Sequence, residues 1–180
     1  NRLWVATVNG VCLYQANGNF KRVSISSANK NIEKILEDKE GRIFFFTMTG
    51  LYQYDEKNNR AITRLSKMVE KNCYNYSCHI DRKDVMWIVT SYSVKGYRTQ
   101  DLKLIAQNPV QSYPIASFLL DGHQLYISGY NGMQLFDTDT RKWQHLPAAL
   151  QGLQIPNDMV SGIHPYGEKG NLLLSTTKHG

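Results

Sequence analysis

One phrase of sequence returns five times along the chain, and no other feature limits the possible folds as strongly. Each copy has an apolar–aromatic strand that ends in a small residue, then a short turn and a second short strand that ends in an aromatic residue. The small residues that mark the copies are Thr7, Thr47, Thr90, Gly129 and Thr177, which lie 40, 43, 39 and 48 residues apart. Self-similarity at such a period indicates a repeat architecture.

Two weaker strands complete each period, one before the phrase and one after it. The strands after the phrase carry apolar residues three apart: Phe20 and Val23, Ile62 and Leu65, Leu102 and Ile105, Trp143 and Leu146. The strands before the phrase are predicted over residues 32–36, 76–80, 115–120 and 160–163. Turn residues separate them, so each period holds four short strands and no helix.

A period of four short strands is typical of a β-propeller blade. One twisted sheet cannot bury both of its faces alone, but radial stacking covers each face with a neighbour, and residues 43–46 are indeed apolar on both faces. A β-sandwich also has many short strands, but it would not repeat its phrase at this period. The sequence therefore predicts an all-β fold, an arc of a propeller built from four-stranded antiparallel blades.

The predicted arc is one propeller domain over 1–180, with about three whole blades and two partial ones. A partial blade covers 1–24, whole blades cover 25–66, 67–108 and 109–148, and a second partial blade covers 149–180. A ring normally needs more blades, so we expect a piece of a longer protein whose other blades are its partners. Its open ends also predict self-association.

Composition narrows the class of protein without naming a function. Hydrophobic residues make up 42% and charged residues 20% of the chain, as in globular proteins. Neither an apolar run long enough to cross a bilayer nor a signal peptide is present. The net charge of +6 permits acidic partners, but its even spread favours a mixed solvated surface. Cys12, Cys73 and Cys78 are expected to be free thiols, since Cys73 and Cys78 would face opposite sides of one strand.

Four of the five copies resemble the regulator-propeller repeat of bacterial hybrid two-component sensors. The second copy matches at nearly every fixed position of that repeat, and its matching residues are Ile32, Ile35, Asp38, Gly41, Ile43, Phe44, Thr47, Gly50, Leu51 and Tyr54. The third copy departs from the repeat, because Asp84 and Ser93 stand where it has glycine. The fifth has His164 and Pro165 where Glu and Asp are usual.

The resemblance implies a periplasmic sensor region of an inner-membrane protein. In that family tandem propellers precede a transmembrane helix, a cytoplasmic histidine kinase and often a receiver and a DNA-binding regulator, which together form a phosphorelay. The ligands are commonly breakdown products of polysaccharides. The resemblance therefore implies signal transduction in response to an oligosaccharide, with no direct contact between this segment and nucleic acid.

The acidic residues argue against an enzyme. Turns of a four-stranded blade alternate between two edges, and 12 of the 15 acidic residues fall in turns of the edge that propellers seldom use for binding. A glycosidase needs two converging carboxylates, and only Glu70 and Asp158 lie in turns of the other edge. No metal-ligand spacing, nucleophile elbow or phosphate-binding loop is present, so neither a cofactor nor a metal is expected.

The turns before the third strand of each blade are the candidate ligand site. Tyr92 and Tyr130 offer flat faces for a sugar ring, and the other candidates are Asn131, Lys178, His179 and Asn9. Trp4 and Trp87 are predicted to lie in the core. Two further functions stay open, a fragment of a propeller glycosidase or lyase and a scaffold for protein–protein contact.

Overall fold

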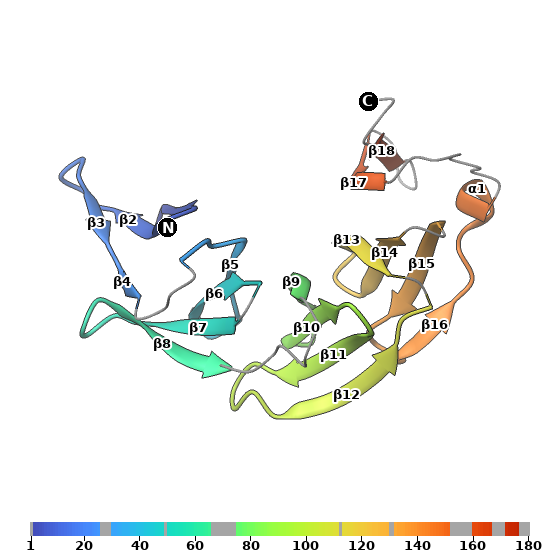
Figure 1. Ribbon diagram of the computed structural model, residues 1–180, viewed down its shortest axis with the longest axis horizontal. Helices are drawn as coiled ribbons and strands as arrows, with labels where there is room; N and C mark the ends of the chain where they lie inside the picture. The colour runs from blue at the N-terminus through green and yellow to red at the C-terminus, as the bar shows by residue number, and fades with distance from the viewer. Residues whose placement is uncertain are drawn as a thin grey trace. The chain divides into compact units, whose positions relative to one another are not determined.

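The structure is a computed structural model that describes residues 2–25, 30–48, 50–65, 75–111, 113–129, 132–151, 160–166 and 172–176. Over these residues it is nearly all β (Figure 1), and the one helix is the single turn α1 (Ala148–Gln151). The chain forms two compact units, residues 1–78 and 79–180. No helix among the described residues is both long and apolar enough to cross a membrane.

The first unit holds two antiparallel sheets. One has the order β1-β2-β3, from strands β1 (Trp4–Thr7), β2 (Gly10–Tyr14) and β3 (Phe20–Arg22). The other has the order β8-β7-β6-β5, from strands β5 (Lys34–Glu37), β6 (Ile43–Thr47), β7 (Gly50–Asp55) and β8 (Arg60–Leu65). A two-residue strand, β4 (Ser24–Ile25), adds to β8 in parallel, which is the exception to the antiparallel pairing.

The second unit continues the same pattern. Its first sheet is made of β10 (Val85–Thr90), β11 (Ser93–Arg98), β12 (Leu104–Pro109) and β9 (Asn75–Ile80), of which only the last two residues are assigned to this unit. Its second sheet is made of β13 (Pro114–Leu120), β14 (Gln124–Gly129), β15 (Gly132–Asp137) and β16 (Lys142–Gln144). A two-stranded sheet of β17 (Val160–Pro165) and β18 (Leu172–Thr176) follows. The predicted fold class, four-stranded antiparallel blades of a β-propeller, is confirmed; the blade bounds and the single domain stay predictions.

Sheets pack face to face through their apolar strands. In the second unit Trp87 and Val89 of one sheet form a core with Leu125, Ile127 and Phe136 of the next. In the first unit Val11 packs with Phe45 and Tyr52, and Trp4 is half-buried against them. Both faces of β6 and β10 are buried, which explains why their sequences do not alternate between apolar and polar residues. Trp87 is fully buried, as predicted, whereas Trp4 is only partly so.

A threonine hydroxyl closes the turn that follows the marker residue in three of the five copies, those of Thr7, Thr47 and Thr90. The Thr47 hydroxyl donates to the Gly50 carbonyl at 3.1 Å and accepts the Gly50 N–H at 3.0 Å. Thr90 makes the same pair of bonds with Ser93, each at 3.0 Å, and the Ser93 hydroxyl adds a third at 3.1 Å. A serine therefore replaces the glycine of the repeat without breaking the turn.

A buried aspartate organises the turn before the second strand. The Asp81 carboxylate accepts the N–H groups of Lys83 and Val85 at 2.8 and 2.9 Å and the indole N–H of Trp87 at 2.7 Å. Asp84 takes the position of the missing glycine with a φ of 64°, which aspartate tolerates better than most residues. The Asp84 carboxylate also accepts the Thr99 hydroxyl at 2.6 Å. The second departure from the repeat is thus accommodated as well.

Candidate functional site

Consecutive antiparallel strands place the turns of a blade alternately on two edges. We use the name hairpin edge for the edge on which four turns of the second unit lie: 81–84, 99–103, 121–123 and 138–141. We use the name linker edge for the other edge, which carries the turn 91–92, residues 110–111 after β12 and the segment after β16. Backbone bonds join the turns of each edge: Arg82 N–H donates to the Gly122 carbonyl at 2.8 Å, and Val110 N–H to the Tyr92 carbonyl at 3.0 Å.

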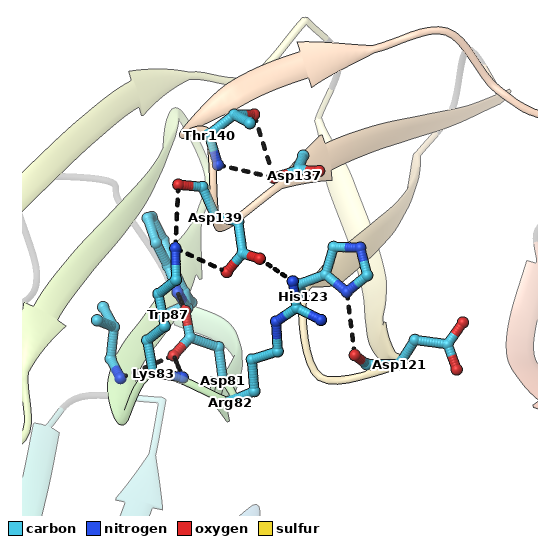
Figure 2. Close-up of polar contacts among 10 residues, drawn as sticks. Asp81, Arg82, Lys83, Trp87, Asp121, His123, Asp137, Asp139 and Thr140 are labelled. Carbon is cyan, nitrogen blue, oxygen red and sulfur yellow. Dashed lines mark hydrogen bonds and ion pairs between the residues drawn. The ribbon is translucent and has the colours of Figure 1, made fainter.

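The hairpin edge uses its acidic residues for structure. Figure 2 shows Arg82 and Lys83 directed toward Asp139, which belongs to the next sheet of the same unit, and both form ion pairs with it. The hydrogen bond from Arg82 holds the pKa of the Asp139 carboxyl below its usual range. This arrangement fastens two sheets together and leaves Asp139 paired with two cations.

Other carboxylates in the turns also form hydrogen bonds and ion pairs within the protein. Asp38 accepts two backbone N–H groups and the Arg42 guanidinium, in the way Asp81 accepts its three donors. Asp55 pairs with Arg60 at 3.1 Å and accepts the Asn58 amide at 2.7 Å. Carboxylates held in this way cap turns and bind cations, roles that differ from those of a catalytic acid and base.

The first surface pocket lies in the first unit and has a volume of about 350 Å³. Its walls come from the turn between β1 and β2 and from the chain that leaves β3: Asn9, Gly10, Arg22, Val23, Ser24, Ile25 and Lys30. The Arg22 guanidinium donates to the Asn9 carbonyl at 2.5 Å, which fixes one cation at the wall. With Lys30 beside it, this pocket suits a ligand that carries negative charge.

The second surface pocket lies in the second unit and has a volume of about 290 Å³. Its walls come from three segments of the linker edge: the connection after β12, the facing ends of β15 and β16, and the segment that ends in α1. The lining residues are Gln111, Met133, Gln134, Leu135, Trp143, Gln144, His145, Leu146 and Gln151. We call it the glutamine pocket. No aspartate, glutamate, lysine or arginine is among them.

The structure describes two of the six residues that the sequence predicted for the ligand site. Asn9 is exposed and lines the first pocket. Tyr92 is 53% exposed on the linker edge. Its carbonyl accepts the N–H of Val110, which directly precedes a segment that lines the glutamine pocket. Tyr130, Asn131, Lys178 and His179 lie outside the described residues. Asn9 and Tyr92 belong to different units.

The sequence reasoning missed most of the residues that line the two pockets. Arg22 was not singled out, although it lies near the end of a predicted strand, where the chain reaches the edge expected to bind. Trp143 was assigned only to an outer strand, and the four glutamines lie in three segments far apart in the sequence. A search for polar residues at the ends of outer strands would have found Gln144 and His145. Within the described residues, no group of three or more His, Cys, Asp or Glu side chains could hold a metal ion.

Comparison with known proteins identifies similar folds without a similar sequence. No protein-family model matches the chain, and no curated protein matches it. Among solved structures, the extracellular domain of the BT4673 protein of B. thetaiotaomicron superposes with a TM-score of 0.74 at 20% identity, over 97% of this chain and 25% of that one. A second structure of that domain, named for a hybrid two-component system, gives a TM-score of 0.66 at 20% identity over 85% and 22% of the two chains.

An enzyme is also among the similar structures. Virginiamycin B lyase from Staphylococcus aureus superposes with a TM-score of 0.62 at 12% identity, over 85% of this chain and 56% of that one. All of these identities are below 25%, so the likeness shows the fold, a β-propeller. The chain spans about a quarter of the length of the two-component extracellular domain.

Proposed function

We propose that this chain is a non-enzymatic, ligand-sensing part of an extracytoplasmic propeller in a hybrid two-component sensor histidine kinase and response regulator. The observation that carries the proposal is the superposition on two structures of the BT4673 extracellular domain. One, named for a one-component system, covers 97% of the chain, and the other, named for a hybrid two-component system, covers 85%. The aspartate, threonine and tyrosine residues that match the repeat support the same assignment. In the structure the aspartate and the threonine each form hydrogen bonds that hold a turn. The location is periplasmic, in a protein of the inner membrane.

We further propose that the ligand is a carbohydrate. Both pockets are lined by hydrogen-bonding side chains, and neither contains a pair of carboxylates. Binding without turnover is what a receptor requires, and the amides and the indole ring of the glutamine pocket supply the donors, acceptors and flat face that sugars use.

One experiment tests the function and its main rival together. The protein that contains this chain is titrated calorimetrically with a panel of plant and bacterial oligosaccharides, and each mixture is then chromatographed. We expect at least one oligosaccharide to bind and to be recovered intact. Recovery of shortened or unsaturated products would instead identify a propeller glycosidase or lyase, and an absence of binding across the panel would refute a carbohydrate receptor.

The rival function, a fragment of a propeller enzyme, has the lyase fold likeness in its favour. A lyase needs a base near the substrate, and His145 in the glutamine pocket is the one lining residue of that kind. Elimination products that disappear in a His145→Ala variant would establish that function. Intact recovery of the bound ligand would exclude it.

A further inference from the structure

The glutamine pocket combines an aromatic wall with several polar side chains that make no hydrogen bond to the described residues. Trp143 packs edge-to-face on Phe136, with ring centroids 5.2 Å apart and the planes at 67°. This contact fixes the indole, which also forms part of the pocket wall. Across the part of the chain that the structure describes, the indole N–H of Trp143 and the side chains of Gln144 and His145 make no hydrogen bond.

One hydrogen bond fixes a second part of the pocket wall. The N–H of Gln111 donates to the side-chain oxygen of Gln134 at 2.8 Å, and Gln134 is only 9% exposed. This bond connects the segment after β12 to β15, so two neighbouring sheets of the unit contribute to one pocket. At the third wall the Gln151 amide nitrogen donates to the Leu146 carbonyl at 2.5 Å, which secures the end of α1 beside β16.

The residue types limit what the pocket can bind. A bound anion or cation would lose its hydration without meeting an opposite charge, because every lining side chain is uncharged or, for His145, a weak base. A purely apolar ligand would offer no hydrogen bond to the Gln144 amide, the His145 imidazole or the Trp143 indole N–H. Amide and imidazole groups both donate and accept hydrogen bonds, as hydroxyl groups do, and an indole face suits the C–H face of a sugar ring.

We infer that the glutamine pocket binds an uncharged, hydroxyl-rich ligand, namely a neutral saccharide, with Trp143 as its stacking face and Gln144 and His145 as hydrogen-bonding partners. This inference rests on the proposed function for the biological origin of the ligand. It assigns the specificity for neutral sugars to the linker edge of the blade formed by β13–β16. The volume of about 290 Å³ is near the lower end of the range for ligand pockets, about 300–1,000 Å³, and is suited to a short saccharide.

The test compares matched variants of the protein that contains this chain. Gln144→Ala and His145→Ala remove exposed pocket side chains, and Trp143→Phe keeps an aromatic ring against Phe136 but removes the N–H and half of the flat face. Lys142→Ala is the control, because Lys142 is exposed on the same strand and does not line the pocket. The probes are neutral malto-, xylo-, manno- and cello-oligosaccharides, with oligogalacturonate as the charged comparator.

We expect a neutral oligosaccharide to bind and to change tryptophan fluorescence. Each pocket variant should weaken that binding about tenfold, which corresponds to about 1.4 kcal/mol, and the Lys142→Ala variant should bind normally. Thermal unfolding of each variant shows whether it is folded, and the exposed Gln144 and His145 positions keep the test valid if Trp143→Phe is unstable.

Each remaining outcome contradicts a different claim. If a neutral saccharide binds with unchanged affinity in all three variants, the site lies elsewhere and the proposed receptor function still stands. If the variants lose binding but the bound saccharide is cleaved, the pocket is confirmed and the receptor function fails. Preference for oligogalacturonate, or no binding of any neutral saccharide, overturns the inference.

Discussion

Single polar residues fix the turns of each blade, and Asp81 illustrates how much one side chain can hold. Its carboxylate accepts three hydrogen bonds, one of them from the buried indole of Trp87, and the residue is 4% exposed. Replacing Asp81 by alanine leaves these donors without acceptors. We expect Asp81→Ala to lower the free energy of unfolding by about 1–3 kcal/mol, measured by urea denaturation.

Asp101 supplies the matched control for this substitution. It also accepts a backbone N–H in a turn, from Lys103 at 3.1 Å, but its side chain is 48% exposed. Asp101→Ala should therefore change stability by less than about 0.5 kcal/mol. Equal effects at the two positions would show that burial of the donors at Asp81 does not matter.

The cysteines differ in reactivity because they differ in burial. Cys12 and Cys78 are free thiols; Cys12 is half-buried, whereas Cys78 is fully buried, which raises the pKa of its thiol. In the native protein iodoacetamide should modify Cys12 well before Cys78, as read by peptide mass spectrometry. After denaturation without reductant we expect all three cysteines to be alkylated, Cys73 included. A disulfide between Cys73 and Cys78 would contradict this prediction.

The packing between adjacent strands can be tested by substituting two glycines. A methyl group on Gly96 of β11 would lie 2.8 Å from the Trp87 ring, which is fully buried and cannot withdraw. We expect Gly96→Ala to cost about 1–3 kcal/mol of stability and to change the near-ultraviolet circular dichroism of the tryptophans.

Gly162 of β17 is the matched position for comparison. There the nearest atom to the added methyl group is the Ser175 hydroxyl oxygen at 2.6 Å, which can rotate away. Gly162→Ala should therefore destabilise the protein less than Gly96→Ala. The reverse order would mean that the Trp87 ring is more mobile than its packing indicates.

The turn that carries Asp139 makes one contact between sheets dependent on pH. The pKa of Asp139 is lowered in the folded protein by its bond to Arg82, so the stability that it contributes is present above its unfolded pKa of about 4 and is lost as pH falls toward the folded value. Asp139→Asn should flatten the fall in stability below about pH 5, measured by thermal unfolding at several pH values. The control Lys142→Ala should keep the full slope, and an unchanged slope in Asp139→Asn would contradict the role of this ion pair.

The strands could be predicted from the sequence better than the contacts between segments that are distant in the sequence. Thr47 and Thr90 mark turns that recur at a fixed period, so both the strands beside them and the fold class follow from pattern alone. The parallel pair of Ser24 and Ile25 with β8 lacks such a signal, because two residues show no periodicity. The glutamine pocket could not be predicted, since Gln111, Trp143 and Gln151 meet only after three segments have folded together.

Among the described residues, the sheets β1–β3 and β17–β18 have three and two strands. Phe20 and Leu173 on these sheets are 58% and 55% exposed, and Leu3, directly before β1, is 59% exposed. Covering apolar surface stabilises a complex by about 25 cal/mol per Å². We therefore expect the 180-residue chain to self-associate, with an average mass in multi-angle light scattering that rises with concentration. A constant monomer mass at all concentrations would show that these faces are too small to drive association.

The threonine that closes the turn before the third strand has a consequence for how such a protein can change over evolution. Thr90 is bonded across the turn to Ser93, so the conformation of the turn does not depend on the side chain of Tyr92 at its tip. The same holds for Val8 and Asn9 between Thr7 and Gly10, where the Thr7 hydroxyl donates to the Gly10 carbonyl. Tip residues can thus be substituted while strand register is preserved. At these two turns the exposed tip residues can change while the hydrogen bond that closes the turn is kept, so new ligand preferences can arise there by single substitutions.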